Sequence, residues 1–125
     1  MSQALQEVAS VDWSLNDPSL LKTQAYINGE WVDADDGATF TVLNPATHEV
    51  VAEVADVGEA ETRRAIAAAE AARKDWAAKS AMERSAVLRK WNDLILENVD
   101  DLGILMTVEQ GKILAEARGE VIYAA

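Results

Sequence analysis

The sequence contains no cysteine. It therefore forms no disulfide, holds no metal through thiolate ligands and offers no thiol as a nucleophile. Histidine is nearly absent too, because His48 is the only one, and it lies in a predicted turn without a carboxylate pair at ligand spacing. A metal or triad site needs several such groups together, so we interpret His48 as an exposed turn residue.

Basic residues are few as well. The chain has 11 lysines and arginines against 22 aspartates and glutamates, which gives a net charge of -11. No basic patch interrupts this acidity, and it disfavours nucleic acid and anionic membranes as partners. The chain also has no long apolar run, and its amino terminus has no basic region followed by a continuous apolar segment, as an export signal would have. From these absences we predict a soluble, cytoplasmic protein with no nucleic acid and no membrane as partner.

The glycine motifs that bind phosphate groups are missing from the sequence. Gly103 lies too far from Gly111-Lys112 for a phosphate loop, and Ile113 occupies the position that requires serine or threonine. No G-x-G-x-x-G motif follows a predicted strand. These residues therefore do not form a complete dinucleotide site.

The chain has the size of one ordinary domain, so we place no boundary within residues 1–125. Residues 1–16 are weakly patterned and are predicted to be a loose lead-in. Asp17-Pro18 then offers a helix cap and a first-turn proline, which predicts a short helix through Lys22.

The first half of the chain has the two-residue period of β-strands. Asn28-Gly29 between two such segments is a strong hairpin signal, and Asp35-Asp36-Gly37 predicts a second turn. Asn44-Pro45 ends a strand, because proline cannot donate to a ladder and restricts the residue before it. We expect a small, mainly antiparallel sheet with strands over residues 26–27, 30–32, 39–43 and 50–54.

The second half is alanine-rich and has the period of amphipathic helices. In the first predicted helix Ile66, Ala69 and Trp76 share one stripe, and residues 77–79 separate it from the next. Ser80 and Glu83 have the spacing of a capping box. The clearest apolar face of the chain follows and consists of Val87, Leu88, Trp91, Leu94 and Ile95.

A further helix is predicted to begin between Asn98 and Asp101 and to end at Gly111. Glycine supplies the left-handed position that ends a helix, and Lys112 places positive charge near the negative dipole end. Helical spacing resumes after Lys112, with Ile113 as the first predicted helical residue. On these residues alone, the stretch is a structural corner with a solvated Glu109 and Lys112.

This corner also carries a family resemblance. The segments TVEQGK (107–112) and LAEARGEVIYAA (114–125) resemble a region near the amino end of NAD(P)-dependent aldehyde dehydrogenases. Their sequences resemble the succinate-semialdehyde dehydrogenase type most. Further matches lie upstream, in Leu15-Asn16-Asp17-Pro18, in residues 26–32 and in Asn44-Pro45-Ala46-Thr47. The resemblance therefore extends from about Leu15 to the last residue.

The resemblance implies an α/β fold of the aldehyde dehydrogenase type, with this chain as its amino-terminal portion. It also implies a homo-oligomeric enzyme that oxidises a small aldehyde, succinate semialdehyde, to the carboxylate with NAD or NADP. In that family a cysteine nucleophile, a glutamate base, an oxyanion-stabilising asparagine and a Rossmann-like sheet lie beyond the part that this chain resembles. The chain alone is therefore expected to be inactive.

One binding role inside this chain is implied by the resemblance. Many aldehyde dehydrogenases hold a structural monovalent cation between backbone carbonyls of the strand before Asn-Pro and an acidic side chain just before the Gly-Lys turn. Those positions match Val42, Leu43 and Glu109, although the family often has aspartate at the last of them. Carbonyl and carboxylate oxygens suit a hard cation. Without the resemblance, Glu109 is interpreted as a solvated side chain.

A second interpretation stays open on the sequence. The chain could be a self-standing small α+β protein that contributes a helical face to an assembly and catalyses nothing. A longer reading frame with a downstream cysteine nucleophile favours the enzyme interpretation. A stop codon after Ala125, with a monomeric and cooperatively folded product, favours the assembly protein.

Overall fold

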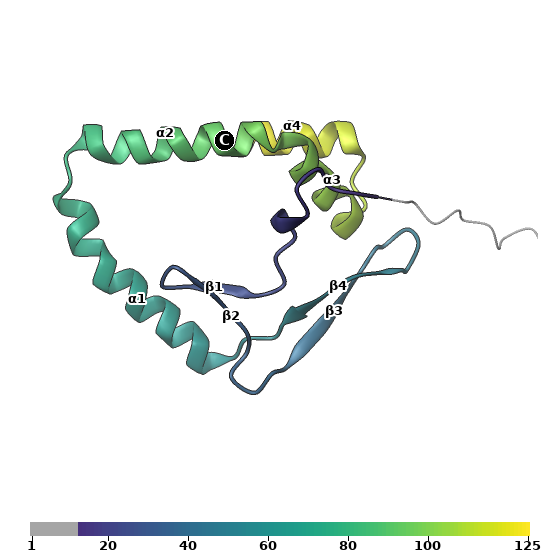
Figure 1. The fold of residues 1–125 in the computed structure, drawn as a ribbon, viewed down its shortest axis with the longest axis horizontal. Coiled ribbons are helices and arrows are strands. Elements are labelled where there is room, and N and C mark those ends of the chain that lie inside the picture. The colour runs from purple at the N-terminus through teal and green to yellow at the C-terminus, as the bar shows by residue number, and fades with distance from the viewer. Residues whose placement is uncertain (1–12) are drawn as a thin grey trace, which may run out of the picture.

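A computed structural model of the chain describes residues 13–125. Over this range a short 3-10 helix comes first, the strands follow, and the longer helices come last, as predicted (Figure 1). The elements are a 3-10 turn η1 (Pro18–Leu20), strands β1 (Ala25–Ile27), β2 (Glu30–Val32), β3 (Thr39–Leu43) and β4 (Val50–Ala55), and helices α1 (Glu59–Ala78), α2 (Ala81–Glu97), α3 (Val99–Gln110) and α4 (Leu114–Ala124).

The four strands form two antiparallel pairs, β1 with β2 and β3 with β4. The antiparallel prediction is confirmed, and the strands divide between two ladders because each hairpin pairs its backbone groups within itself. Asn28 and Gly29 make the first turn with positive φ angles of 52° and 85°, as a tight hairpin turn requires. One backbone hydrogen bond, from the Ala55 N–H to the Thr23 carbonyl, joins the segment before β1 to β4.

The predicted capping box at the start of α2 is confirmed. The Ser80 Oγ accepts from the Glu83 N–H at 3.2 Å, and the Glu83 carboxylate accepts from the Ser80 N–H at 2.7 Å. Helix α1 continues through Ala78 and is capped at Lys79, so the predicted break over 77–79 is shorter than expected. Alanine favours helix, and two of the three predicted break residues are alanines.

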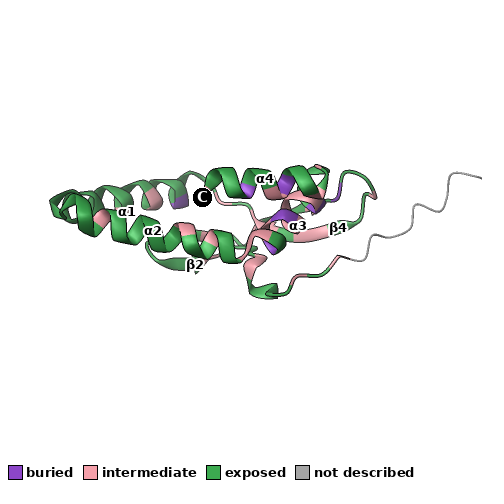
Figure 2. Ribbon diagram, turned by 90° about the horizontal axis from the view of Figure 1, so that it is seen from above, coloured by how far each residue is buried: buried purple, intermediate pink, exposed green. Residues whose placement is uncertain are grey.

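The best-buried part of the described chain lies where α3 crosses α4 (Figure 2). Val108, Ala117 and Val121 are 3%, 0% and 6% exposed. Gly111 ends α3 with φ 79°, and its N–H donates to the Thr107 carbonyl at 2.9 Å. Helix α4 begins at Leu114, one residue later than predicted, because Ile113 has extended backbone and acts as the N-cap.

The apolar face predicted for α2 is exposed in this structure. Trp91 is 62% exposed and is therefore not a core anchor within the described residues. Val87, Leu88 and Leu94 are about half exposed as well. On α1, Ile66 points to solvent, and the residues next to the β1–β2 hairpin are instead the alanines Ala65, Ala68, Ala69 and Ala72.

Two further sequence-based expectations concern the amino end and the membrane. Most of the predicted lead-in, residues 1–12 of 1–16, lies outside the described residues, but Asn16 is held against α3 through Asp101. Among helices α1 to α4, none combines the length and the apolar character needed to cross a lipid bilayer.

Candidate functional site

The turn after β3 meets the turn after α3. At Gly111 an added Cβ would lie 3.0 Å from the Pro45 Cγ, so the two segments are in close contact. A side chain at Gly111 would meet this ring, and its φ of 79° would be strained for any other residue. The contact brings together two segments that the sequence analysis placed in one site (Figure 1).

Asn44 organises the turn between β3 and β4. Its buried side chain accepts from the Ala46 N–H at 2.9 Å and from the Thr47 N–H at 3.4 Å. Its carbonyl accepts from the His48 N–H at 2.8 Å, and its own N–H donates to the Glu49 carbonyl at 2.9 Å. Each bond fixes the turn, and His48 is exposed within it with a left-handed φ of 62°.

The predicted cation ligands lie on the two segments that meet at this corner. Val42 is half-buried, whereas Leu43 and Glu109 are exposed. The β3–β4 register shifts between Val42 and Leu43, which pair with Ala52 and Val50, so the residue left without a partner in this ladder is Val51 on β4. Over residues 13–125, the Glu109 carboxylate takes part in no recorded ion pair or side-chain hydrogen bond. A carboxylate oxygen such as that of Glu109 is a ligand type that hard cations prefer.

Asp101 connects α3 to the segment before β1. Its buried carboxylate accepts from the Asn16 N–H at 2.9 Å, from the Asn16 side-chain amide at 3.0 Å and from the Asp17 N–H at 2.8 Å. The partners are about 85 residues apart in sequence, so these bonds close a long loop. Backbone donation from Asn16, and then from Asp17, lowers the pKa of Asp101 below its ordinary value and favours the charged form.

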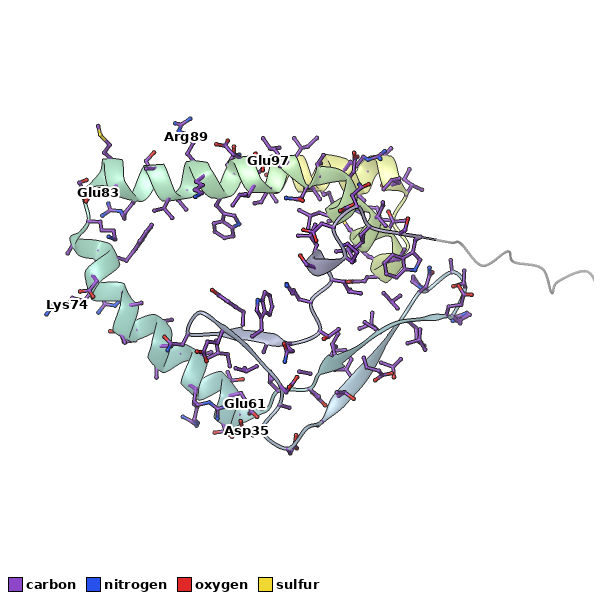
Figure 3. All side chains as sticks on the ribbon, viewed as in Figure 1. Asp35, Glu61, Lys74, Glu83, Arg89 and Glu97 are labelled. Atoms are coloured by element: carbon purple, nitrogen blue, oxygen red, sulfur yellow. The ribbon has the colours of Figure 1, made fainter. Side chains whose placement is uncertain are left out.

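A second buried carboxylate joins the loop after β2 to the start of α1. Glu61 accepts from the Asp35 N–H at 2.8 Å and from the Gly58 N–H at 3.1 Å, and the donated bond from Asp35 contributes most to its lowered pKa. Arg64 donates two bonds of 2.7 Å to the Asp35 carboxylate. Figure 3 shows Asp35 and Glu61 close together at the beginning of α1.

The α3–α4 crossing depends on a glycine. A Cβ added at Gly103 would lie 3.0 Å from the Arg118 Cγ and 3.4 Å from the Arg118 backbone N, so the helices approach closely at this point. The Arg118 Nε lies 2.7 Å from the Asp100 carboxylate as an ion pair, without the alignment of a hydrogen bond. The crossing therefore holds Asp100 at the start of α3 against Arg118 on α4.

These features provide scaffold and not reaction chemistry. In the part of the chain that the structure describes, no three histidine or acidic side chains gather into a metal-ion cluster. The sequence has no cysteine, and no glycine-rich strand-to-helix loop that would cradle a pyrophosphate. Over the described residues, these features therefore connect and position elements of the fold.

Comparison with known proteins identifies the protein family. The model of the aldehyde dehydrogenase family matches residues 31–125, which is well over half of the chain. The chain belongs to the aldehyde dehydrogenase family. The resemblance found in the sequence is thereby confirmed, and the matched range includes the β3–β4 pair, the Asn44-Pro45 turn and the α3–α4 corner.

Several curated relatives are named as semialdehyde dehydrogenases. The chain is 60% identical over 111 residues to the glutarate-semialdehyde dehydrogenase of Pseudomonas putida. It is 51% identical over 111 residues to the NADP(+)-dependent succinate-semialdehyde dehydrogenase of Escherichia coli. Each alignment covers 89% of this chain and 23% of the relative, so the chain spans about a quarter of these aldehyde dehydrogenases.

A solved aldehyde dehydrogenase confirms the fold. The succinate-semialdehyde dehydrogenase of Burkholderia pseudomallei superposes with a TM-score of 0.87 and 56% sequence identity. The superposition covers 90% of this chain and 23% of that enzyme. The strands and helices described above therefore have the arrangement found in an aldehyde dehydrogenase, as the α/β prediction required.

The sequence analysis did not predict the roles of Asp101 and Glu61. It assigned no role to either carboxylate. One signal was available, because Asp101, Leu105 and Val108 lie at i, i+4 and i+7 and therefore share a helix face. A carboxylate on a face that becomes buried needs hydrogen-bond donors, which here come from Asn16 and Asp17.

Proposed function

We propose that this chain is the amino-terminal scaffold of an NAD(P)+-dependent aldehyde dehydrogenase that oxidises a small semialdehyde carrying a carboxylate. The main support is sequence identity of 51–60% to semialdehyde dehydrogenases over almost the whole described chain. Succinate semialdehyde is the substrate that the sequence resemblance favours, and glutarate semialdehyde, one methylene longer, is the alternative that the Pseudomonas relative adds. The enzyme is proposed to be a homo-oligomer.

The proposed reaction converts the aldehyde and water to a carboxylate while NAD(P)+ accepts a hydride. This chain contributes no nucleophile, because it contains no thiol. Its residues instead fix the geometry of the scaffold: Asp101 holds the segment before β1, Glu61 holds the loop after β2, and Gly111 packs on Pro45. Small displacements of a scaffold reduce catalysis, so these contacts would act on the rate indirectly.

We also propose that the corner between β3 and α3 binds a monovalent cation through the Val42 and Leu43 carbonyls and the Glu109 carboxylate. The contact of Pro45 with Gly111 supports this assignment, because it brings the turn after β3 to the end of α3. The cation would tie the end of β3 to the end of α3 and stabilise the native state by mass action. In the intact enzyme, the melting temperature should then depend on whether potassium, sodium or a bulky organic cation is present, and Glu109→Gln should remove that dependence.

The function can be tested with a hybrid enzyme. The matching quarter of the Escherichia coli succinate-semialdehyde dehydrogenase is replaced by this chain in one continuous polypeptide. We expect the hybrid to reduce NAD+ or NADP+ with succinate or glutarate semialdehyde, whereas this chain alone reduces neither. A hybrid that folds and oligomerises like its parent, but oxidises no aldehyde, would contradict the proposal.

A further inference from the structure

The asparagines of the chain differ in how their side chains are held. All of them lie within the described residues, and most make a side-chain hydrogen bond: Asn16 to Asp101, Asn44 to the Ala46 N–H, Asn92 to the Ala125 carbonyl and Asn98 to the Leu94 carbonyl. Asn28 is exposed, and its side chain makes no hydrogen bond within residues 13–125. It is also the only asparagine in the sequence that is followed by glycine.

Asn28 and Gly29 form the tip of the β1–β2 hairpin (Figure 1). Their φ angles of 52° and 85° match a type I′ turn, which has values of about 60° and 90°. The Gly29 N–H donates to no backbone carbonyl among the described residues. Glycine has no side chain to shield this nitrogen, and the nearest atom to an added Cβ is the Tyr26 Oη at 4.0 Å. Both residues of the tip are therefore open to water and to each other.

We propose that Asn28 is a site of spontaneous deamidation, which converts the tip of the hairpin to aspartate and isoaspartate. Hydroxide removes the proton of the Gly29 backbone nitrogen, and this nitrogen attacks the Asn28 Cγ. A new N–Cγ bond forms, the Cγ–Nδ2 bond breaks, and the leaving nitrogen takes a proton from water and departs as ammonia. The product is a cyclic imide. The attack is intramolecular, so it needs no encounter between separate molecules.

Water then opens the imide in one of two ways. Addition at Cγ gives aspartate, whereas addition at the backbone carbonyl carbon of residue 28 gives isoaspartate, in which the main chain runs through Cβ and Cγ. The net reaction consumes one water and releases one ammonia, and nothing is oxidised or reduced. Both products carry one more negative charge than the asparagine form.

The other asparagines lack one of these conditions. Asn44 is followed by Pro45, whose nitrogen has no proton to lose. The nitrogen after Asn16 belongs to Asp17, and its N–H donates to the buried Asp101 carboxylate at 2.8 Å. The remaining two asparagines lie within α2 and at its end, and backbone carbonyls hold both of their side-chain amides. The structure therefore selects Asn28 for this reaction.

The two products act differently on the hairpin. Asp-Gly also favours a type I′ turn, so the aspartate form keeps the strand register. Isoaspartate adds a methylene to the main chain of the loop, and loop length fixes the register of a hairpin. Tyr26 is paired with Trp31 across this hairpin, and their ring centroids are 5.0 Å apart. The isoaspartate form should lose this contact between the two rings.

The test incubates this chain in mildly alkaline and in mildly acidic buffer. Trypsin then releases residues 23–63 as one peptide, because no lysine or arginine lies between Lys22 and Arg63. We expect the mass to rise by the exchange of an NH2 group for OH, with the change at Asn28 and not at Asn44. The reaction should be several-fold faster in alkaline buffer, because hydroxide removes the amide proton. Isomerisation at Asp36-Gly37 leaves the mass unchanged and does not interfere.

Two variants of Asn28 separate the chemistry from its structural effect. Asn28→Gln keeps an amide on a longer side chain, which closes a larger ring far more slowly, and should release no ammonia in the same incubation. Freshly purified Asn28→Asp has the charge of the product without the added methylene. It should keep the near-ultraviolet circular dichroism of the Tyr26–Trp31 pair, which the alkali-treated parent should lose.

A synthetic peptide of residues 22–34 gives the rate of the same reaction without the fold. We expect the folded chain to react at Asn28 within several-fold of this rate, because its hairpin tip is exposed and its amide is free. A chain that stays unmodified at Asn28 while the peptide reacts would overturn the inference. Equal modification of Asn28 and Asn44, or a gain in mass that persists in Asn28→Gln, would overturn it as well.

Discussion

Helices α2 and α3 both carry apolar residues at helical spacing, yet only α3 buries them. Val108 on α3 is 3% exposed, whereas Val87 on α2 is 52% exposed. Helix α3 is followed directly by α4, and the glycine turn at Gly111 folds α4 back onto it. Helix α2 has no comparable neighbour within the described residues. The comparison shows that an amphipathic pattern predicts which side of a helix will be covered, but not whether the same segment of chain provides the cover.

The largest effect on the free energy of unfolding is expected at Gly103, where α3 and α4 approach each other most closely. Gly103→Leu must displace Arg118, whose Cγ would lie 3.0 Å from the new Cβ, and should lower the free energy of unfolding by about 3 kcal/mol. Gly119→Leu is the matched control on α4, because no atom lies within 4 Å of its new Cβ. It should raise stability by up to roughly 0.8 kcal/mol through helix propensity.

Urea unfolding, followed by circular dichroism, measures both variants. Similar stabilities for Gly103→Leu and Gly119→Leu would show that the helices cross more loosely than described.

A pair of valines compares the two regions directly. Val108→Ala should reduce the free energy of unfolding by roughly 2 kcal/mol, because it removes two buried methyl groups and leaves a cavity. Val87→Ala should change it by less than about 0.5 kcal/mol, because that side chain is already in solvent. The same urea titration decides the matter, and an equal loss in both variants would mean that α2 is covered within this chain.

The Asp101 carboxylate gives a pH-dependent prediction. Its pKa is lower in the folded chain than the ordinary value of 3.8, so its charged form stabilises the fold above that value. This contribution should disappear as the pH falls through the lowered pKa. Asp101→Asn should lower the melting temperature at pH 7 and flatten its dependence on pH below about 4.

Asp100→Asn is the control for this prediction, because the neighbouring Asp100 is exposed and, among residues 13–125, pairs with Arg118 alone. Thermal melts between pH 7 and pH 3 compare both variants with the parent. The prediction is contradicted if Asp100→Asn flattens the dependence of the melting temperature on pH below about 4 as much as Asp101→Asn does.

The smallest expected effect concerns the connection between α3 and α4. Ile113 already has a φ of -64°, which is the angle that proline imposes. Its N–H donates to no backbone carbonyl among the described residues. Ile113→Pro should therefore be tolerated, or should stabilise the chain by about 0.4–1 kcal/mol by restricting the unfolded state. A loss of more than about 1 kcal/mol would indicate that the Ile113 N–H has a partner in solution.

Local features of this fold could be predicted from the sequence because their causes are local. Asn28-Gly29 and Gly111 adopt the positive φ angles that glycine and asparagine permit. Ser80 and Glu83 form the expected capping box. His48 was predicted to lie in a turn, but its left-handed φ of 62° was not predicted.

Long-range features were predicted less well. No residue near Asp101 in the sequence indicates that its carboxylate accepts a hydrogen bond from Asn16. Likewise, the helical spacing of Trp91 does not show whether another segment of chain covers this side chain. Of the candidate site, the contact between the Asn44-Pro45 turn and Gly111 agrees with the family resemblance. Cation binding by Val42, Leu43 and Glu109 stays a prediction.

Hydrogen exchange of the backbone amides tests the contrast between the two regions most directly. In this chain alone, the amides of α3 and α4 should exchange slowly, because their helices bury Val108, Ala117 and Val121 against each other. The amides of α2 should exchange much faster, and should become protected in the hybrid enzyme. Equal protection of α2 and α3 in the isolated chain, or an α2 that stays unprotected in an active hybrid, would contradict the account.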